Sequence, residues 1–293
     1  MKKILIIALA IVMAFSFIAC KGETEGELEL PPAQEIVDRA IESIGNVRTY
    51  RFDMDMTMKM SGESEGRPVE VRTDMDSTGA LDMENQEMMM DMTMNMATPD
   101  EEEIRMAMAI YIIEDMMYMM TDIPMMYMDT SWTKSEVPEG TWEEISEQMN
   151  QIESMVEILD AAKVEITGTE KVGGIDCYVV EVTPDLKQLW EMVVKNAAAA
   201  GEVGAFVGEV ETHLDEILRG FSVKYWIAKD TYFLAKMETD ITMHLTPEAM
   251  GYPEEEGEVA MNITMDMLAY DYNQSVSIVL PPEAEDAVEM SMP

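Results

Sequence analysis

The sequence contains few of the residues on which most catalytic and metal sites depend. Its 293 residues include only two cysteines, Cys20 and Cys177, and two histidines, His213 and His244. It lacks the nucleophile-elbow, zincin, dinucleotide-binding and P-loop motifs. His213 lies in a helical stretch and His244 falls on the polar side of an alternating stretch, where solvated side chains are expected. We therefore expect neither an enzyme nor a bound cofactor.

Basic residues are also scarce. The chain has 19 Lys and Arg against 59 Asp and Glu, so its formal net charge is −40. A field of this sign repels phosphate backbones and excludes nucleic acid as a partner. Carboxylate pairs are too common here to mark a site, and residues 101–103 and 254–256 lack the glycine-centred spacing of an EF-hand loop.

Long hydrophobic runs are missing after residue 20, where nothing approaches the roughly 18 apolar residues of a membrane span. The longest apolar run, Ile4–Phe17, lies at the N-terminus after Lys2 and Lys3. It is short for a permanent membrane anchor. It ends in Phe17-Ile18-Ala19-Cys20, which resembles the lipobox of bacterial lipoproteins. That resemblance implies a signal peptide at residues 1–19, lipidation of Cys20 and a lipid anchor on the extracytoplasmic side of the cell membrane. An uncleaved N-terminal anchor is the alternative.

Lipidation of Cys20 would leave Cys177 without a disulfide partner. Cys177 lies in an apolar, strand-like run, where a small buried hydrophobic residue is expected. Residues 20–32 are acidic and carry glycine and proline, which is typical of a flexible tether. We expect a monomer with one domain at residues 33–282, an end of the ordered part at Pro281 and Pro282, and an acidic tail at 283–293.

Hydrophobic periodicity predicts a mainly β domain. Apolar residues at helical spacing predict a helix over 33–44. From Tyr50 onward they recur at every second position, as in a strand with one apolar face. The same alternation predicts strands at 50–60, 69–76, 88–96, 104–112, 115–120, 127–134, 163–169, 177–183, 222–228, 232–245 and 259–272.

Two further helical regions are predicted, at 141–161 and 184–219. One-sided strands need a cover for their apolar face, and the three helices are the candidates. We therefore predict an α+β fold: a strongly curved antiparallel β-sheet, or half-barrel, with helices covering its apolar concave face.

Several short segments resemble one known family of lipoproteins. The helix at Ala33–Ala40 and the following Asn46–Tyr50 are similar to the start of LolA-like lipoprotein carriers. Gly168–Pro184 resembles a strand–turn–strand of the LppX/LprG lipoproteins. Tyr225–Lys236 resembles the family's hairpin, and Tyr270–Asn273 with Val279–Pro281 resembles its usual end. The resemblance implies a half-barrel that encloses an apolar cavity for acyl chains.

Methionine is unusually abundant in this sequence, with 34 copies. Methionine could simply be the apolar residue of the sheet's core, or its flexible thioethers could line an adaptable ligand cavity. Thioethers also bind Cu(I), and the densest cluster, Met116, Met117, Met119 and Met120 with Met125 and Met126, would be the favoured place. The residues predicted to line a ligand cavity are Met54, Met56, Met58, Met90, Met92, Met94, Met106, Met108, Met261, Ile263 and Met265.

These patterns favour a membrane-anchored, non-enzymatic lipoprotein that binds a lipid or another apolar small molecule. Two alternatives remain open: a lipoprotein that binds the soft metals Cu(I) or Ag(I), and a surface interaction module with a packed interior.

Overall fold

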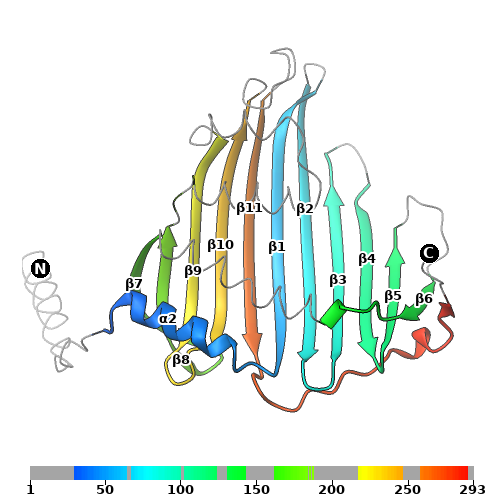
Figure 1. The fold of residues 1–293 in the computed structure, drawn as a ribbon. Helices are drawn as coiled ribbons and strands as arrows, with labels where there is room; N and C mark the ends of the chain where they lie inside the picture. The colour runs from blue at the N-terminus through cyan, green and yellow to red at the C-terminus, as the bar shows by residue number, and fades with distance from the viewer. Residues whose placement is uncertain are drawn as a thin grey trace, which may run out of the picture. The chain divides into compact units, whose positions relative to one another are not determined.

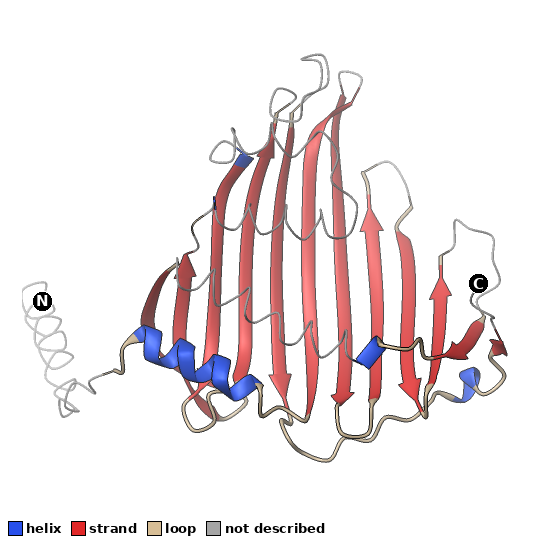
Figure 2. Cartoon of the chain, viewed as in Figure 1, coloured by secondary structure: helices blue, strands red, loops and turns tan. Residues whose placement is uncertain are grey.

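The computed structural model describes residues 30–64, 67–99, 102–123, 131–142, 162–183, 185, 187, 217–246 and 258–289. The chain divides into two units, Met1–Pro32 and Ala33–Pro293, and the second contains the whole sheet. Strands make up most of its described part (Figure 2). Within that part, the helical elements with described bounds are α2 (Ala33–Ile44) and the 3₁₀ helix η2 (Pro282–Ala284). Its strands are β1 (Thr49–Ser64), β2 (Arg67–Asp82), β3 (Glu87–Ala97), β4 (Ile104–Ile113), β5 (Met116–Asp122), β6 (Trp132–Glu136), β7 (Lys163–Val172), β8 (Ile175–Thr183), β9 (Leu218–Ala228), β10 (Leu234–Leu245), β11 (Val259–Tyr270) and β12 (Val288–Glu289).

All twelve strands belong to one curved sheet, in the order β12-β6-β5-β4-β3-β2-β1-β11-β10-β9-β8-β7 (Figure 1). Among the described strands the sheet does not close, since β12 and β7 form its two edges. Neighbouring strands are antiparallel except for the short β12–β6 pair, which is parallel. The predicted curved antiparallel sheet is confirmed.

Two of the three predicted covering helices lie mostly in segments that the structure does not describe. Residues 143–161 and most of 184–219 lie outside the described residues, so their place over the sheet stays a prediction. The predicted helical region is wrong at its end, because β9 already begins at Leu218. Leu218 pairs with Met243 of β10, so the ladder of the sheet decides the backbone there.

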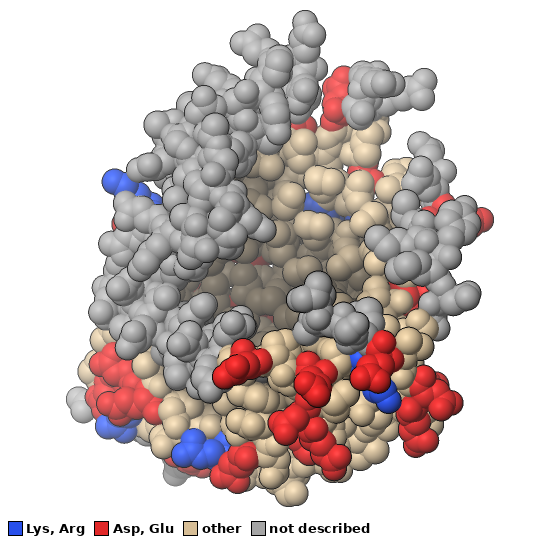
Figure 3. All heavy atoms as spheres, turned by 45° about the vertical axis from the view of Figure 1, so that its right-hand side comes forward, with Lys and Arg blue, Asp and Glu red and all other residues tan. Residues whose placement is uncertain are grey.

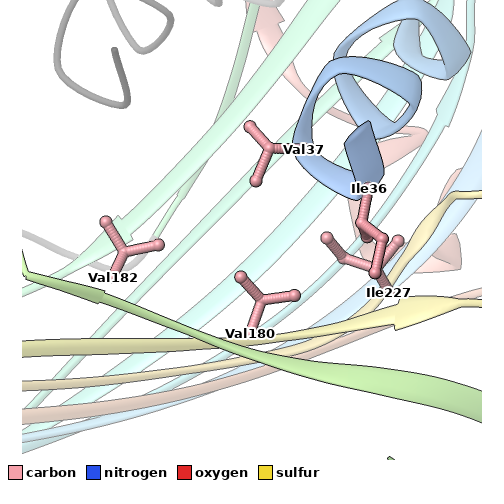
Figure 4. Packing of buried hydrophobic residues seen from close by; sticks show 5 residues of the cluster. All are labelled: Ile36, Val37, Val180, Val182 and Ile227. Carbon is pink, nitrogen blue, oxygen red and sulfur yellow. The ribbon is translucent and has the colours of Figure 1, made fainter. Parts of the chain in front are cut away.

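The helix α2 lies against one face of the sheet at its β7–β9 side. Ile36 is fully buried and packs with Val180, Val182 and Ile227 of β8 and β9 (Figure 4). This apolar contact fixes the helix to the sheet, as its 3.6-residue periodicity predicts. Within the described residues, no helix has the length and apolar character needed to span a membrane.

Polar contacts hold α2 at the same place. Arg39 Nη1 donates a hydrogen bond to Tyr232 Oη at 2.7 Å, and its guanidinium also lies 5.1 Å from the centre of the Tyr232 ring. Ser43 Oγ donates to the Tyr232 carbonyl at 3.1 Å. Tyr232 stands in the β9–β10 connection, so the helix is bound to a loop as well as to the strands.

The C-terminal segment covers part of the opposite face. Ile278 packs in a cluster with Ala80, Ala109 and Tyr111, which lie on the face away from α2. The ordered chain then continues past the prolines at which the sequence predicts its end, through η2 and β12. Ala284 is fully buried, and this burial keeps the acidic segment on the body of the protein.

Candidate functional site

Strand register places most of the described methionines on a single face of the sheet. Directly paired residues of antiparallel strands point to the same side, and each strand alternates. Met56, for example, stands between Met265 of β11 and Met75 of β2. We call this set the methionine face; it is the face on which α2 lies. Its members are Met54, Met56, Met58, Met60, Met75, Met88, Met90, Met92, Met94, Met96, Met106, Met108, Met117, Met119, Met237, Met243, Met261, Met265 and Met267.

Every residue that the sequence predicts as cavity lining points to this face, including Ile263, which pairs with Met58. The strands also bring methionines together in a way that the sequence does not show. Five successive strands, from β11 to β4, place a methionine at one level of the sheet, in the row Met265, Met56, Met75, Met94 and Met106. Contact of these residues with a ligand stays a prediction.

The methionine face is half-buried. Met75, with 9% of its surface exposed, is the most buried of the described methionines, and the other members of the set are half-buried. None of the three hydrophobic clusters found among the described residues contains a member of the methionine face. Seen from the side of α2, the described residues surround a hollow, and most of those visible inside it are uncharged (Figure 3).

Charge is strongly segregated between the two sides of the sheet. Within the stretches 54–60, 71–79, 88–96, 104–112, 237–245 and 259–267, no Asp, Glu, Lys or Arg points to the methionine face. The opposite face carries Asp53, Asp55, Asp74 and Asp76 in the same strands. Burial raises the pKa of Tyr225, which stands beside Met237, to about 12, so this phenol is neutral at physiological pH. The site is therefore apolar and uncharged.

Two hydroxyl groups interrupt the apolar surface of β2. Thr73 pairs with Met58 and Met96, and Ser77 pairs with Met54 and Met92, so both point to the methionine face. Their exposed fractions are 3% and 2%. Among the described residues, neither Thr73 Oγ1 nor Ser77 Oγ has a hydrogen-bond partner. The sequence predictions missed both residues, although Thr73 and Ser77 are in phase with Val71 and Met75.

The cluster predicted as the favoured metal site is divided by the sheet. Met117 and Met119 point to the methionine face, whereas Met116 and Met120 point to the opposite one, because successive residues of a strand alternate. Met125 and Met126 lie outside the described residues. The described parts of the chain also contain no group of three or more His, Cys, Asp or Glu side chains that could hold a metal ion.

The remaining candidate residues fall away from the methionine face or outside the described chain. His244 lies on the opposite face, with Nε2 3.2 Å from Glu258 Oε2, as the alternation predicts. Cys177 is fully buried beside Trp226, which confirms the expected packing role, and this burial raises the pKa of its thiol. His213 and the predicted lipidation site Cys20 lie outside the described residues.

Residues 32–289 match the model of a family described as a family of unknown function, DUF6612. The chain belongs to this family. No curated protein matches the chain.

Solved structures similar to this DUF6612 chain include LprF from Mycobacterium bovis, with a TM-score of 0.39, 14% identity and coverage of 86% of this chain and 98% of that one. The lipoprotein LppX from Mycobacterium tuberculosis has a TM-score of 0.36 and 10% identity, with 85% and 99% covered. A putative outer membrane lipoprotein-sorting protein domain from Vibrio parahaemolyticus has a TM-score of 0.21 and 11% identity, with 84% and 95% covered. At these identities and TM-scores the three structures are chains similar to this one and no more. What the chain binds is argued from its own residues.

Proposed function

We propose that this protein is a non-enzymatic, lipid-anchored binding protein that shelters the acyl chains of a lipid against its methionine face. The observation that supports this best is an uncharged, half-buried apolar face on an open, curved sheet whose other side is acidic. The lipobox-like segment ending at Cys20 supports anchoring to the outer side of the cell membrane. The helices predicted at 141–161 and 184–219 would close over the bound chains.

The driving force is the burial of apolar surface, worth about 0.8 kcal/mol for each methylene before ordering costs. Methionine suits such a surface because its unbranched side chain can repack around chains of different length. The net charge of −40 would hold the body of the protein away from anionic headgroups while the anchor keeps it near the membrane. The protein can thus meet lipid without lying flat on the bilayer.

The test is native mass spectrometry of the full chain, extracted from membranes in mild detergent, followed by organic extraction of bound molecules. We expect co-purified lipid in the wild type and at least about a tenfold loss of it in Met92→Asp and Met106→Asp. Each variant places an unpaired carboxylate on the uncharged face, which costs several kcal/mol on burial.

Thr93→Asp is the matched control, because Thr93 follows Met92 on the same strand but points to the opposite face. This variant should retain lipid. Wild-type protein that carries no lipid, or equal loss in all three variants at unchanged thermal stability, would contradict the proposal.

A second function is favoured by the row of five methionines on neighbouring strands. Neighbouring strands lie about 4.8 Å apart, so three thioethers of this row could converge on one soft ion such as Cu(I) or Ag(I). Protein that gains mass with Ag(I) and never with lipid would support this function, and Met75→Leu should then remove the added mass. Protein that binds neither would favour an interaction module with a packed interior.

A further inference from the structure

Thr73 and Ser77 are the only described residues of β2 between Val69 and Ser77 that place a hydroxyl on the methionine face. Each is almost fully buried, and each lies between two methionines of the adjoining strands. Their oxygen atoms expose less than 1 Å² and have no hydrogen-bond partner within the part of the chain that the structure describes. Apolar side chains of the same size would fill these positions without leaving a donor unsatisfied.

An unsatisfied hydroxyl is costly in such surroundings, because it gives up its hydrogen bonds to water and gains none in return. Nearly all buried polar groups in folded proteins have a partner. Two such groups at alternate apolar positions of one strand, in the middle of a proposed binding face, therefore point to a partner that arrives with the ligand.

We propose that Thr73 and Ser77 donate hydrogen bonds to an uncharged acceptor of the bound lipid, so that the protein selects acyl esters over plain hydrocarbon chains. This inference rests on the proposed lipid-binding function and names the ligand class for the same site. An ester carbonyl accepts a hydrogen bond from a hydroxyl and carries no charge. A free carboxylate fits less well, because the surrounding stretches of the methionine face provide no Lys or Arg to pair with it.

The geometry sets how the two hydroxyls are used. They are four residues apart on one strand, which corresponds to about 13 Å. A single carbonyl can therefore meet only one of them, and a lipid with several acyl esters can meet both. The flanking methionines have three rotatable side-chain bonds, so they can move aside as the chain enters and uncover the hydroxyls.

The experiment compares two probes of equal chain length, methyl palmitate and octadecane, added to the full chain in detergent micelles. Native mass spectrometry measures the fraction of protein that carries each probe. Wild-type protein should favour the ester about tenfold, the factor that corresponds to 1.4 kcal/mol. The double variant Thr73→Val/Ser77→Ala should bind both probes equally.

Thr78→Val is the matched control, since Thr78 follows Ser77 but points to the opposite face and is exposed. It should keep the preference of the wild type. Equal binding of the two probes by wild-type protein would overturn this inference while leaving lipid binding intact. Binding of neither probe would overturn the proposed function itself.

Thermal unfolding without added probe supplies a second readout. The double variant should unfold at a higher temperature than the wild type, because it removes two buried donors that have no partner. A lower unfolding temperature would show that the hydroxyls are already satisfied inside the protein, and this result would also overturn the inference.

Discussion

At the scale of single residues, Gly79 shows how closely the strands of this sheet are fitted. Gly79 lies on the methionine face of β2, opposite Phe52 of β1. The Phe52 ring occupies the space that a Cβ atom at position 79 would need. The glycine therefore leaves room for the Phe52 ring over this part of β2.

Gly79→Ala should destabilise the protein by about 1–3 kcal/mol, because the new methyl group would overlap the Phe52 ring and force it to move. Chemical denaturation followed by circular dichroism measures this change. Gly168→Ala is the matched control: a Cβ atom at position 168 of β7 meets nothing within 4 Å. An equal loss in both variants would show that backbone propensity, and not the ring, causes the effect.

At the scale of paired strands, the acidic face contains a row of carboxylates in register. Asp55 of β1 stands between Asp266 of β11 and Asp76 of β2. The pKa of Asp55 is raised by burial, and further by its hydrogen bond with Asp76 and the nearby negative charges. Asp74 has the opposite environment: hydrogen bonds from Arg72 and Thr57 lower its pKa to about 2.

These two carboxylates should affect stability with opposite signs. A raised pKa in the folded state means that Asp55 destabilises the fold at neutral pH, and that this effect disappears as the pH falls below its unfolded pKa. Asp55→Asn should therefore raise the unfolding temperature at pH 7 more than at pH 4. Asp74 stabilises the fold above its unfolded pKa, and this contribution is lost as the pH falls toward 2, so Asp74→Asn should lower the unfolding temperature at pH 7.

Thermal unfolding of both variants between pH 3 and pH 7 tests these signs. A destabilised Asp55→Asn protein at neutral pH would mean that the row of carboxylates is held by favourable contacts, contrary to this account.

Sequence periodicity predicted the elements of the sheet well, and their ends less well. The period-two alternation placed β1, β3 and β4 within a few residues, because each has one apolar and one polar face. β2 extends to Asp82, well beyond the predicted 69–76. Its last part contains Ser77, Thr78 and Gly79, which break the apolar pattern but pair with β1 and β3 on both sides. Tertiary pairing, and not local preference, makes this part a strand.

At the scale of the whole molecule, the dominant property is the imbalance of charge. A net charge of −40 in a chain of this size makes the folded state repel itself. Few of the described carboxylates form ion pairs that would offset this repulsion. The ion pairs that occur are mostly exposed, such as Lys171 with Asp176, and exposed pairs add little stability. The fold must therefore rely on apolar burial and on its strand ladder.

Added salt should stabilise the protein, because it shortens the screening length from about 30 Å at 0.01 M to about 8 Å at 0.15 M. We expect the unfolding temperature of the full chain to rise by several degrees over this range at pH 7. The same measurement near the sequence pI of about 4.1 is the control, and the effect of salt should be small there. An equal rise at both pH values would assign the effect to salting-out of apolar surface.

The amino-acid pattern alone was enough to predict the curved antiparallel sheet and the apolar side of its strands, because strict alternation leaves only one way to turn a strand toward a core. It therefore placed Met54, Met92 and Met106 on an apolar face. Only the tertiary structure decided which strands are neighbours, since register depends on contacts between segments far apart in the chain. That register joined Met265, Met56, Met75, Met94 and Met106 into one row and set Thr73 and Ser77 among them. The methionines of the neighbouring strands surround these two hydroxyls, which therefore find no hydrogen-bond partner among the described residues.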